Sequence, residues 1–519
     1  MRVPFAAGVL ACALLLTLAA MDVSARPGGG NSYSGRSSSS GSSSGGSSSS
    51  GSGSSCSDSS STYSSKGTPI NPIHASLGKS YTPHLAILLL VLFLIGWFAQ
   101  PKAAEEQTLD IGGHAPEDTG SIRDLDEMLK RLRQSDPGFS MILFEDFAST
   151  LYIESQRARH DPRALAGLAP YWVRSELDLL AERDPRGAVV EAVVVGMLRP
   201  RSVFEEDSRL RIDCEVEANL HLRVIEETAN GSSRQAKAIT QFVAETWTFS
   251  RAREATTKPW TGVRRLGCPS CGAALSAGGD VRCPACGQAS GEGRFDWQVT
   301  TATLHKAETR PHALTGTSEE AGTDSPTQFA NGFRTRLAAL LRDDPALSLK
   351  SIEARLRLIF ETLQASWAAQ DLRPLRPFVS DRQYDALNYW IDAYKEQGLR
   401  NLMDNPRITG SALVRVQRDA HYDAITLRLW ATGCDYTIDQ QGTVVGGSRT
   451  EERNYSEYWT LIRSARARGT PRLDRNCPGC GGALILNMAG QCEHCGAHVT
   501  SGEFDWVLSK IEQDEAYRG

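Results

Sequence analysis

The chain has 519 residues, a formal net charge of -5 at pH 7 and 12 cysteines. This length suffices for roughly two to four domains and excludes a small scaffold that depends on disulfides for its stability. The mildly acidic balance argues against a general attraction to nucleic acid or anionic lipid, although it leaves room for local basic patches. Eight of the cysteines form C-x-x-C pairs, a spacing typical of metal sites rather than of a disulfide framework.

The N-terminal residues predict a secretory signal. Arg2 supplies a positive charge, residues 5–20 are mostly apolar, and residues 23–25 offer small side chains for cleavage. We therefore assign residues 1–25 to a signal peptide, with an uncleaved first membrane span as the alternative. Residues 26–80 are rich in Gly and Ser and are expected to be disordered, because such a composition cannot bury a core.

A second apolar stretch predicts a transmembrane helix at residues 81–101. No Lys, Arg, Asp or Glu occurs in this window, and a helix of this length crosses the hydrocarbon core of a bilayer. The alternative is a buried core helix, but the linker-like flanks, including residues 102–121, offer no domain to bury it. A cleaved signal followed by one span places the C-terminal part in the cytoplasm, as two uncleaved spans also do. We therefore expect a single-pass protein of the cytoplasmic (inner) membrane, and the many thiols suit that reducing compartment.

Residues 122–262 are predicted to form a domain in which helices precede strands. Asp136 is expected to cap a helix with Pro137 at its first position, and apolar residues then recur at helical spacing. Further along, apolar residues recur at every second position, which predicts strands. The helix carries Phe144, Phe147 and Leu151 on one face, and the predicted strands are residues 189–198, 209–224 and 241–250.

Residues 309–327 are rich in small and polar residues and are expected to link this part to a second domain at residues 328–470. The second domain shows the same order of helices before strands, and Asp344 is again expected to cap a helix. Such an order without alternation of strand and helix predicts the α+β class with an antiparallel sheet. The helix face comprises Ile352, Leu356, Ile359, Leu363 and Trp367, and the clearest strands are residues 425–429 and 455–463.

Each domain is followed by a four-cysteine module, at residues 263–308 and 471–519. Two C-x-x-C-G knuckles facing each other form a tetrahedral four-thiolate site, as in a zinc ribbon, and four thiolates leave no position open for water. We therefore expect two structural zinc ions per chain, with rubredoxin-type iron or paired disulfides as the alternatives. The predicted ligands are Cys268, Cys271, Cys283 and Cys286 in the first module and Cys477, Cys480, Cys492 and Cys495 in the second.

The two halves repeat the same landmarks in the same order, which indicates a tandem duplication of a domain plus a metal-binding module. Besides the knuckles, Asp136-Pro137 returns as Asp344-Pro345, Trp247-Thr248 as Trp459-Thr460, and Phe295-Asp296-Trp297 as Phe504-Asp505-Trp506. The Phe-Asp-Trp segment is expected to be a strand that closes each ribbon.

The second half resembles a known family. The resemblance is carried by W-A-A-Q-D-L-R-P-L-R-P-F-V-S-D (367–381), H-Y-D-A-I-T-L-R (421–428), D-Y-T-I-D (435–439) and Y-S-E-Y-W-T-L-I-R (455–463). These residues look like the Tim-forty-four-like domain, found in a mitochondrial import-motor subunit and in bacterial membrane proteins. The resemblance is weaker over the first half. It implies a cone-shaped domain with helices on a curved antiparallel sheet, similar to nuclear transport factor two, in the membrane-anchored bacterial branch.

The role that this resemblance implies is tethering rather than catalysis. No P-loop, nucleophile elbow or dinucleotide fingerprint occurs, so we expect no enzymatic activity. We expect a scaffold that contacts the lipid bilayer and binds protein partners, with a concave pocket as a candidate ligand site whose aromatic residues Trp390, Trp430 and Trp459 are more simply core. The alternative is a nucleic-acid-associated ribbon. It rests on basic residues between sheet and ribbon, namely Arg251, Arg253, Lys258, Arg264 and Arg265 in the first half and Arg463, Arg466, Arg468, Arg472 and Arg475 in the second.

Overall fold

A computed structural model describes residues 120–519, except for positions 184–187, 207, 228–233, 258–265, 275–281, 290, 311–321, 488 and 515. The predicted signal peptide, Gly/Ser-rich segment, transmembrane helix and nearly all of the first linker lie outside the described residues. Within the part of the chain that the structure describes, no helix is long and apolar enough to cross a membrane.

The first half folds as helices followed by a four-stranded antiparallel sheet with the order β1-β2-β3-β4. Its helices are α2 (Gly120–Ser135), α3 (Met141–Ala158), α4 (Pro162–Gly167), the short 3-10 helix η1 (Ala169–Tyr171) and α5 (Arg174–Ala181). Its strands are β1 (Val189–Glu206), β2 (Arg209–Glu227), β3 (Arg234–Ala252) and β4 (Gln298–Arg310).

The second half also places its long helices before its strands, with a sheet in the order β5-β6-β8-β9 and the short β7 paired to β6. Its helices are α6 (Phe333–Asp343), α7 (Leu349–Ala368), η2 (Arg376–Phe378), α8 (Asp381–Glu396) and η3 (Val499–Ser501). Its strands are β5 (Arg400–Arg418), β6 (Tyr422–Ile438), β7 (Val444–Gly447), β8 (Arg453–Ser464) and β9 (Val507–Gln513).

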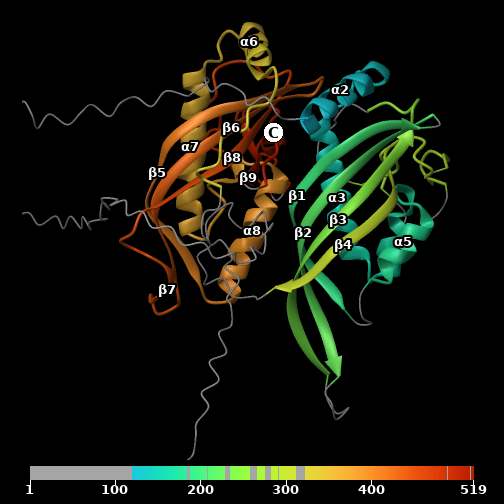
Figure 1. Cartoon of the computed structure of the whole chain (residues 1–519), viewed down its shortest axis with the longest axis horizontal. Helices are drawn as coiled ribbons and strands as arrows, with labels where there is room; N and C mark the ends of the chain where they lie inside the picture. The colour runs from blue at the N-terminus through green and yellow to red at the C-terminus, as the bar shows by residue number, and fades with distance from the viewer. Residues whose placement is uncertain are drawn as a thin grey trace, which may run out of the picture.

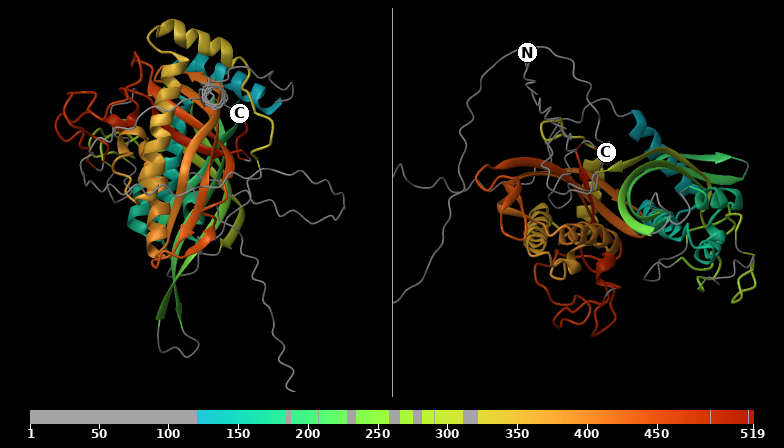
Figure 2. Two further views of the ribbon diagram at one scale, coloured as in Figure 1. Left: turned by 90° about the vertical axis from the view of Figure 1, so that its left-hand side faces the viewer. Right: turned by 90° about the horizontal axis from the view of Figure 1, so that it is seen from below.

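The two halves lie side by side, and each sheet curves around helices of its own half (Figures 1 and 2). This arrangement confirms the predicted mixture of helices and curved antiparallel sheets. In each half a cluster of buried apolar side chains fills the space between sheet and helices. The predicted face of α7 belongs to that core, since Ile352, Leu356, Ile359, Leu363 and Trp367 are all buried.

The helix starts differ from the prediction. Helices α3 and α7 are capped by Ser140 and Ser348, whose hydroxyls accept hydrogen bonds from backbone N–H groups three residues later. Asp136 and Asp344 lie before these caps in the chain, and both are buried. Each carboxylate forms an ion pair with a buried arginine of its own half. The aspartates are therefore anchors of the tertiary structure, and the prediction that they cap helices is wrong.

The cysteine modules are inserted into the sheets. Strand β4 follows the first module and pairs with β3, and β9 follows the second module and pairs with β8. Trp297 and Trp506 enter the large cores of their own halves. The Phe-Asp-Trp segment thus leads into the edge strand of the large sheet, rather than closing the ribbon as expected.

Strand β6 is buried on both faces, although its sequence alternates. Ile425, Leu427 and Leu429 enter the core, and on the opposite face Arg428 is 1% exposed. The guanidinium of Arg428 donates hydrogen bonds to the backbone carbonyls of Gly322, Thr323 and Ser325 and pairs with Asp514 at 3.1 Å. The second part of the predicted linker therefore lies across the sheet as a held strap, which we define as residues 322–327.

The halves also pack against each other. Helix α8 contacts strand β1 of the first half (Figure 1). A separate apolar cluster joins Leu143 of α3 to Tyr422, Ala424, Ile462 and Val507 of the second half. Each half has its own core, and this third cluster is shared between them.

Candidate metal centres

Each cysteine knuckle of the first module is a tight turn closed by two backbone hydrogen bonds. The N–H of Gly272 donates to the carbonyl of Cys268 at 2.8 Å, and the N–H of Cys268 donates to the carbonyl of Ala273 at 2.7 Å. The second knuckle has the same two bonds, from Gly287 to Cys283 at 2.8 Å and from Cys283 to Gln288 at 2.9 Å. This geometry directs both sulfurs of a pair to the same side of the turn.

The second module repeats this geometry. Gly481 and Gly496 donate to the carbonyls of Cys477 and Cys492, both at 2.8 Å. All four knuckle glycines adopt a left-handed conformation, with φ between 68° and 77°. A residue with a side chain is strained at such a φ, which explains the Gly after the second cysteine of every pair.

The eight predicted ligands form two groups of four. Within each group all four sulfurs lie within 4.8 Å of one another. Neighbouring sulfurs are 3.9 Å apart for Cys268 and Cys286, 3.8 Å for Cys271 and Cys283, and 3.7 Å for Cys477 and Cys495. Four thiolates about 2.3 Å from one tetrahedral metal ion are separated by about 3.8 Å, whereas a disulfide requires about 2.05 Å.

These distances match a four-thiolate metal centre and are compatible with zinc. In both groups the first cysteine of each pair is buried and the second is exposed. Backbone N–H groups of Cys286 and Ala285 lower the pKa of Cys283 to about 7. In the same group the backbone N–H of Ala273 lowers the pKa of Cys271, but the neighbouring thiols outweigh it and raise that pKa to about 11. A metal ion binds thiolates, so its binding would displace the protons that such cysteines hold. Four protein ligands complete a tetrahedron, so each site is suited to holding a fold together rather than to activating water.

In each half a buried arginine connects the cysteine module to the turn that precedes helix α3 or α7. In the first half Arg251 lies 2.6 Å from the carboxylate of Asp136, and its guanidinium stacks over Trp297 at 4.6 Å from the ring centre. Two hydrogen bonds from Thr257, together with the Arg251 pair, outweigh the effect of burial and lower the pKa of Asp136. Trp297 lies where the chain leaves the cysteine module and enters strand β4, so Arg251 fixes the C-terminal end of the module to the domain.

The second half has the same connection. Arg463 lies 2.9 Å from Asp344 and 4.6 Å from the ring centre of Trp506. A second buried arginine, Arg355 of α7, donates two hydrogen bonds to the carbonyl of Trp506 and lies 3.5 Å from Asp505. The exit of the second module is therefore held by two arginines.

A polar cluster fixes the second module to the start of helix α8. The carboxylate of Asp381 accepts hydrogen bonds from Thr500 at 2.7 Å and from Arg376 at 2.6 Å, and it lies 3.3 Å from His498. Burial raises the pKa of Asp381, but these partners outweigh it and lower the pKa to about 2. Gly490 packs so closely that an added Cβ would lie 2.0 Å from the Thr500 hydroxyl. The cluster gave no sequence signal, because its members are far apart in the chain and follow no motif.

The basic candidates divide into buried and exposed residues. Arg251 and Arg463 are 1% exposed and paired, so they cannot contribute to a surface strip for phosphates. Arg253, Arg466, Arg468 and Arg475 are exposed, and Arg472 is partly buried. Lys258, Arg264 and Arg265 lie outside the described residues. The aromatic candidates belong to the core region: Trp390 and Trp459 are members of the core cluster, and the partly buried Trp430 packs against that cluster.

Comparisons with known proteins bear on the second half. No curated protein matches the chain at a significant level. A solved structure described as "Ntf2 like protein involved in plasmid conjugation" is similar over 70% of this chain and 94% of that chain, with 5% identity and a TM-score of 0.19, a score too low to support an argument. Residues 334–472, from helix α6 to the segment before Cys477, match the family model of the Tim44-like domain.

Proposed function

We propose that the protein is a non-enzymatic, membrane-anchored scaffold that holds partner proteins at the inner membrane, in protein transport or membrane-protein assembly. The observation that carries this proposal is the match of residues 334–472 to the Tim44-like domain. That family relationship favours a membrane-associated role in protein translocation. The structural character of both cysteine centres supports it, because neither leaves a coordination position for catalysis.

The proposal includes a tandem duplication that gives the scaffold two units. It is supported by contacts that recur at corresponding positions in the two halves. The Arg–Asp–Trp arrangement is one, and a second is the hydrogen bond from the indole N–H of Trp247 to Glu245 at 2.8 Å, which returns as Trp459 to Glu457 at 2.9 Å. Two units on one membrane anchor offer two binding surfaces. Proteins bound to the two surfaces are held close together, so the effective concentration of one near the other rises.

The first unit is proposed to have a different role from the second. The family match covers the second half, and among the described residues only that half carries the additional hairpin strand β7. Val444 and Val445 on this strand are each 38% exposed, and Leu179 on α5 of the first half is 57% exposed. We infer that the second unit binds the translocation-related partner and that the first binds another protein or supports the second.

Site-specific crosslinking in intact cells tests this function. A photoreactive residue at Val445 is expected to capture membrane-associated proteins, and one at Leu179 is expected to capture a different set. A photoreactive residue at Glu361, which is exposed on α7, serves as the control position. Capture at Val445 that does not exceed capture at Glu361 contradicts the proposed scaffold role of the second unit.

The same cells test the topology. A reporter fused after Gly519 is expected to behave as cytoplasmic, and protease added outside spheroplasts is expected to leave the two domains intact. Digestion of the domains from outside would contradict both the orientation and the argument from reduced thiols.

A further inference from the structure

The interface between the two halves is interrupted by a cavity of about 850 Å³, with walls from α3 and β1 of the first half and from α8 and β9 of the second. Leu143, Tyr422 and Lys510, which make contacts between the halves, all line this cavity. Domains of one chain commonly move relative to each other unless their interface is large and apolar. The packing of the halves therefore depends on a few contacts around the cavity.

One of these contacts is an apolar cluster in which Leu143 of α3 packs with Tyr422 and Val507 of the second half. Val507 is the first residue of β9, the strand that begins where the chain leaves the second cysteine module. The hydroxyl of Tyr422 donates a 3.2 Å hydrogen bond to the carbonyl of Ser501, on the short helix η3 of that module. The second module thus positions both Tyr422 and Val507.

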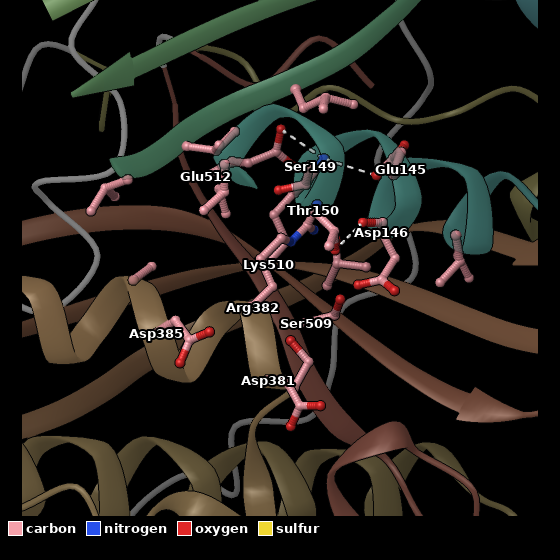
Figure 3. A pocket seen from close by; sticks show the side chains of 18 of the residues that line it. Glu145, Asp146, Ser149, Thr150, Asp381, Arg382, Asp385, Ser509, Lys510 and Glu512 are labelled. Carbon is pink, nitrogen blue, oxygen red and sulfur yellow. Dashed lines mark hydrogen bonds and ion pairs between the residues drawn. The ribbon is translucent and has the colours of Figure 1, made fainter. Parts of the chain in front are cut away.

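Polar contacts also join the halves. The Nζ of Lys510 on β9 lies 3.6 Å from the carboxylate of Glu145 on α3 (Figure 3). The guanidinium of Arg199 on β1 donates a hydrogen bond to the backbone carbonyl of Ala516. Lys510 and Ala516 come after the four cysteines of the second module in the chain, so their positions depend on how β9 is held.

The second module also fixes helix α8, which contacts β1 of the first half. Asp381, the first residue of α8, accepts a 2.7 Å hydrogen bond from Thr500 and lies 3.3 Å from His498. His498 pairs with Gln491 in an isolated antiparallel bridge, and Gln491 directly precedes the ligand Cys492. A short path of bonded residues therefore connects the metal centre to the start of α8.

The first module is anchored within its own half. The strand that follows it, β4, is at the opposite edge of its sheet from β1, the strand that contacts α8. The carbonyl of Gly267 accepts a 2.5 Å hydrogen bond from the hydroxyl of Tyr171, and the carbonyl of Glu292 accepts one from Arg209 at 2.9 Å. Both donors belong to the first half, so disorder in this module is expected to spread within that half.

We propose that the second metal centre controls the packing of the two halves, whereas the first centre does not. Metal binding supplies much of the folding free energy of so small a module. When the second centre is filled, its module holds β9, Tyr422 and α8 in the positions that the first half contacts. When the ion is lost, these contacts loosen together, and the halves separate around the cavity while each keeps its own core. This coupling does not depend on the scaffold function.

Zero-length crosslinking of the full-length protein tests the coupling. A carbodiimide joins Lys510 to Glu145 as an amide while the two side chains stay in contact, and mass spectrometry of the digested protein measures the yield. The variant C477S is expected to give about tenfold less of this crosslink than the wild type, because the two side chains lose their high effective concentration. The matched variant C268S is expected to give the wild-type yield. Hydrogen exchange of α7 in the same samples reports whether the core of the second half stays folded.

Variants that keep all eight cysteines provide a second measurement. The double variant Y422F/T500V removes two hydrogen bonds that the second module makes to the interface and to α8. It is expected to hold two metal ions by elemental analysis, yet to give about threefold less crosslink, since each lost hydrogen bond weakens the connection modestly. The matched variant Y171F removes the hydrogen bond to Gly267 of the first module and is expected to leave the yield unchanged.

Three results would overturn the proposal. One is a wild-type yield of the crosslink in C477S or in Y422F/T500V. Another is an equal loss in the matched variants of the two modules, which would indicate a general loss of stability. The third is a loss of the exchange protection of α7 in C477S, since the second half would then unfold rather than move.

Discussion

The guanidinium of Arg463 lies 2.9 Å from the carboxylate of Asp344, and both side chains are 2% exposed. The pair joins the last residues of strand β8 to the turn before helix α7, which are more than a hundred positions apart in the chain. Arg251 and Asp136 form the corresponding pair at 2.6 Å in the first half. Each pair fixes the position of the tryptophan that follows a cysteine module.

Removing one member of this pair is expected to be costly. The variant D344N removes the nearer of the two carboxylates beside the buried Arg463, since Asp423 lies at 3.9 Å, and we expect the free energy of unfolding to fall by about 3 kcal/mol. The neighbouring variant D343N removes an exposed carboxylate that pairs with Arg418 and should have a much smaller effect. Denaturant unfolding of the three proteins checks this, and equal stability of D344N and D343N would refute the role of the pair.

The metal centres predict a defined stoichiometry. Elemental analysis of the purified protein should find two zinc ions per chain, and the variants C268S and C477S should each retain one. Metal binding supplies on the order of 10 kcal/mol of folding free energy in zinc-finger-sized modules. In each variant, the module that carries the substituted cysteine should therefore unfold before the rest of the protein. Iron in place of zinc, or loss of both ions in a single variant, would contradict this prediction.

The pH dependence of the contact between the second module and α8 follows from Asp381. Its pKa in the folded protein is about 2, below the ordinary value of 3.8, so its contribution is complete above about pH 4 and is lost as the pH falls through about 2. The side chain is 44% exposed, so screening limits this contribution to about 1 kcal/mol. Thermal melts should show D381N less stable than the wild type at neutral pH, with the difference shrinking below about pH 4.

Metal loss in acid also lowers stability, so the metal content of both proteins is measured at each pH. A change in the difference between wild type and D381N belongs to Asp381 where the two proteins hold the same number of ions. A difference between wild type and D381N that stays constant down to pH 2 would show that the carboxylate is not held in its charged form.

The strap of residues 322–327 is expected to tolerate no added side chain at its first position. A Cβ at Gly322 would lie 2.2 Å from the Cβ of Asp514, which is itself held by Arg428. We expect G322A to lower the free energy of unfolding by about 1–3 kcal/mol, as overpacking generally does. The matched variant G167A meets nothing within 4 Å and should be neutral or slightly stabilising. Equal stability of the two variants would show that the strap is loosely held.

Local patterns in the sequence were enough to predict the helix faces, the strands and the eight candidate ligands. The spacing of Ile352, Leu356 and Ile359 predicts burial directly, because a helix at the surface of a domain turns one apolar face toward the core. The C-x-x-C-G pattern likewise reports a turn, because a left-handed residue is needed after the second cysteine. Such features depend on a few neighbouring residues, so they can be predicted without knowledge of the rest of the fold.

Features that depend on distant partners were not predictable. Asp136 and Asp344 looked like helix caps, and only the arginines far along the chain show that they are buried anchors. Arg428 lies in an alternating strand, yet it is buried because the strap returns to cover it. The contact of helix α8 with strand β1 has no sequence signature either, because it exists only once the two halves are placed together.

The insertion of each module before the last strand of its sheet has a consequence for biosynthesis. As the chain emerges from the ribosome, β3 and β8 are complete before their modules and present open edges until β4 and β9 arrive. An open edge invites pairing with other chains, and a module folded around its ion shortens the loop that the last strand must close. We therefore expect cells short of zinc to accumulate this protein as aggregates rather than as a soluble apo form.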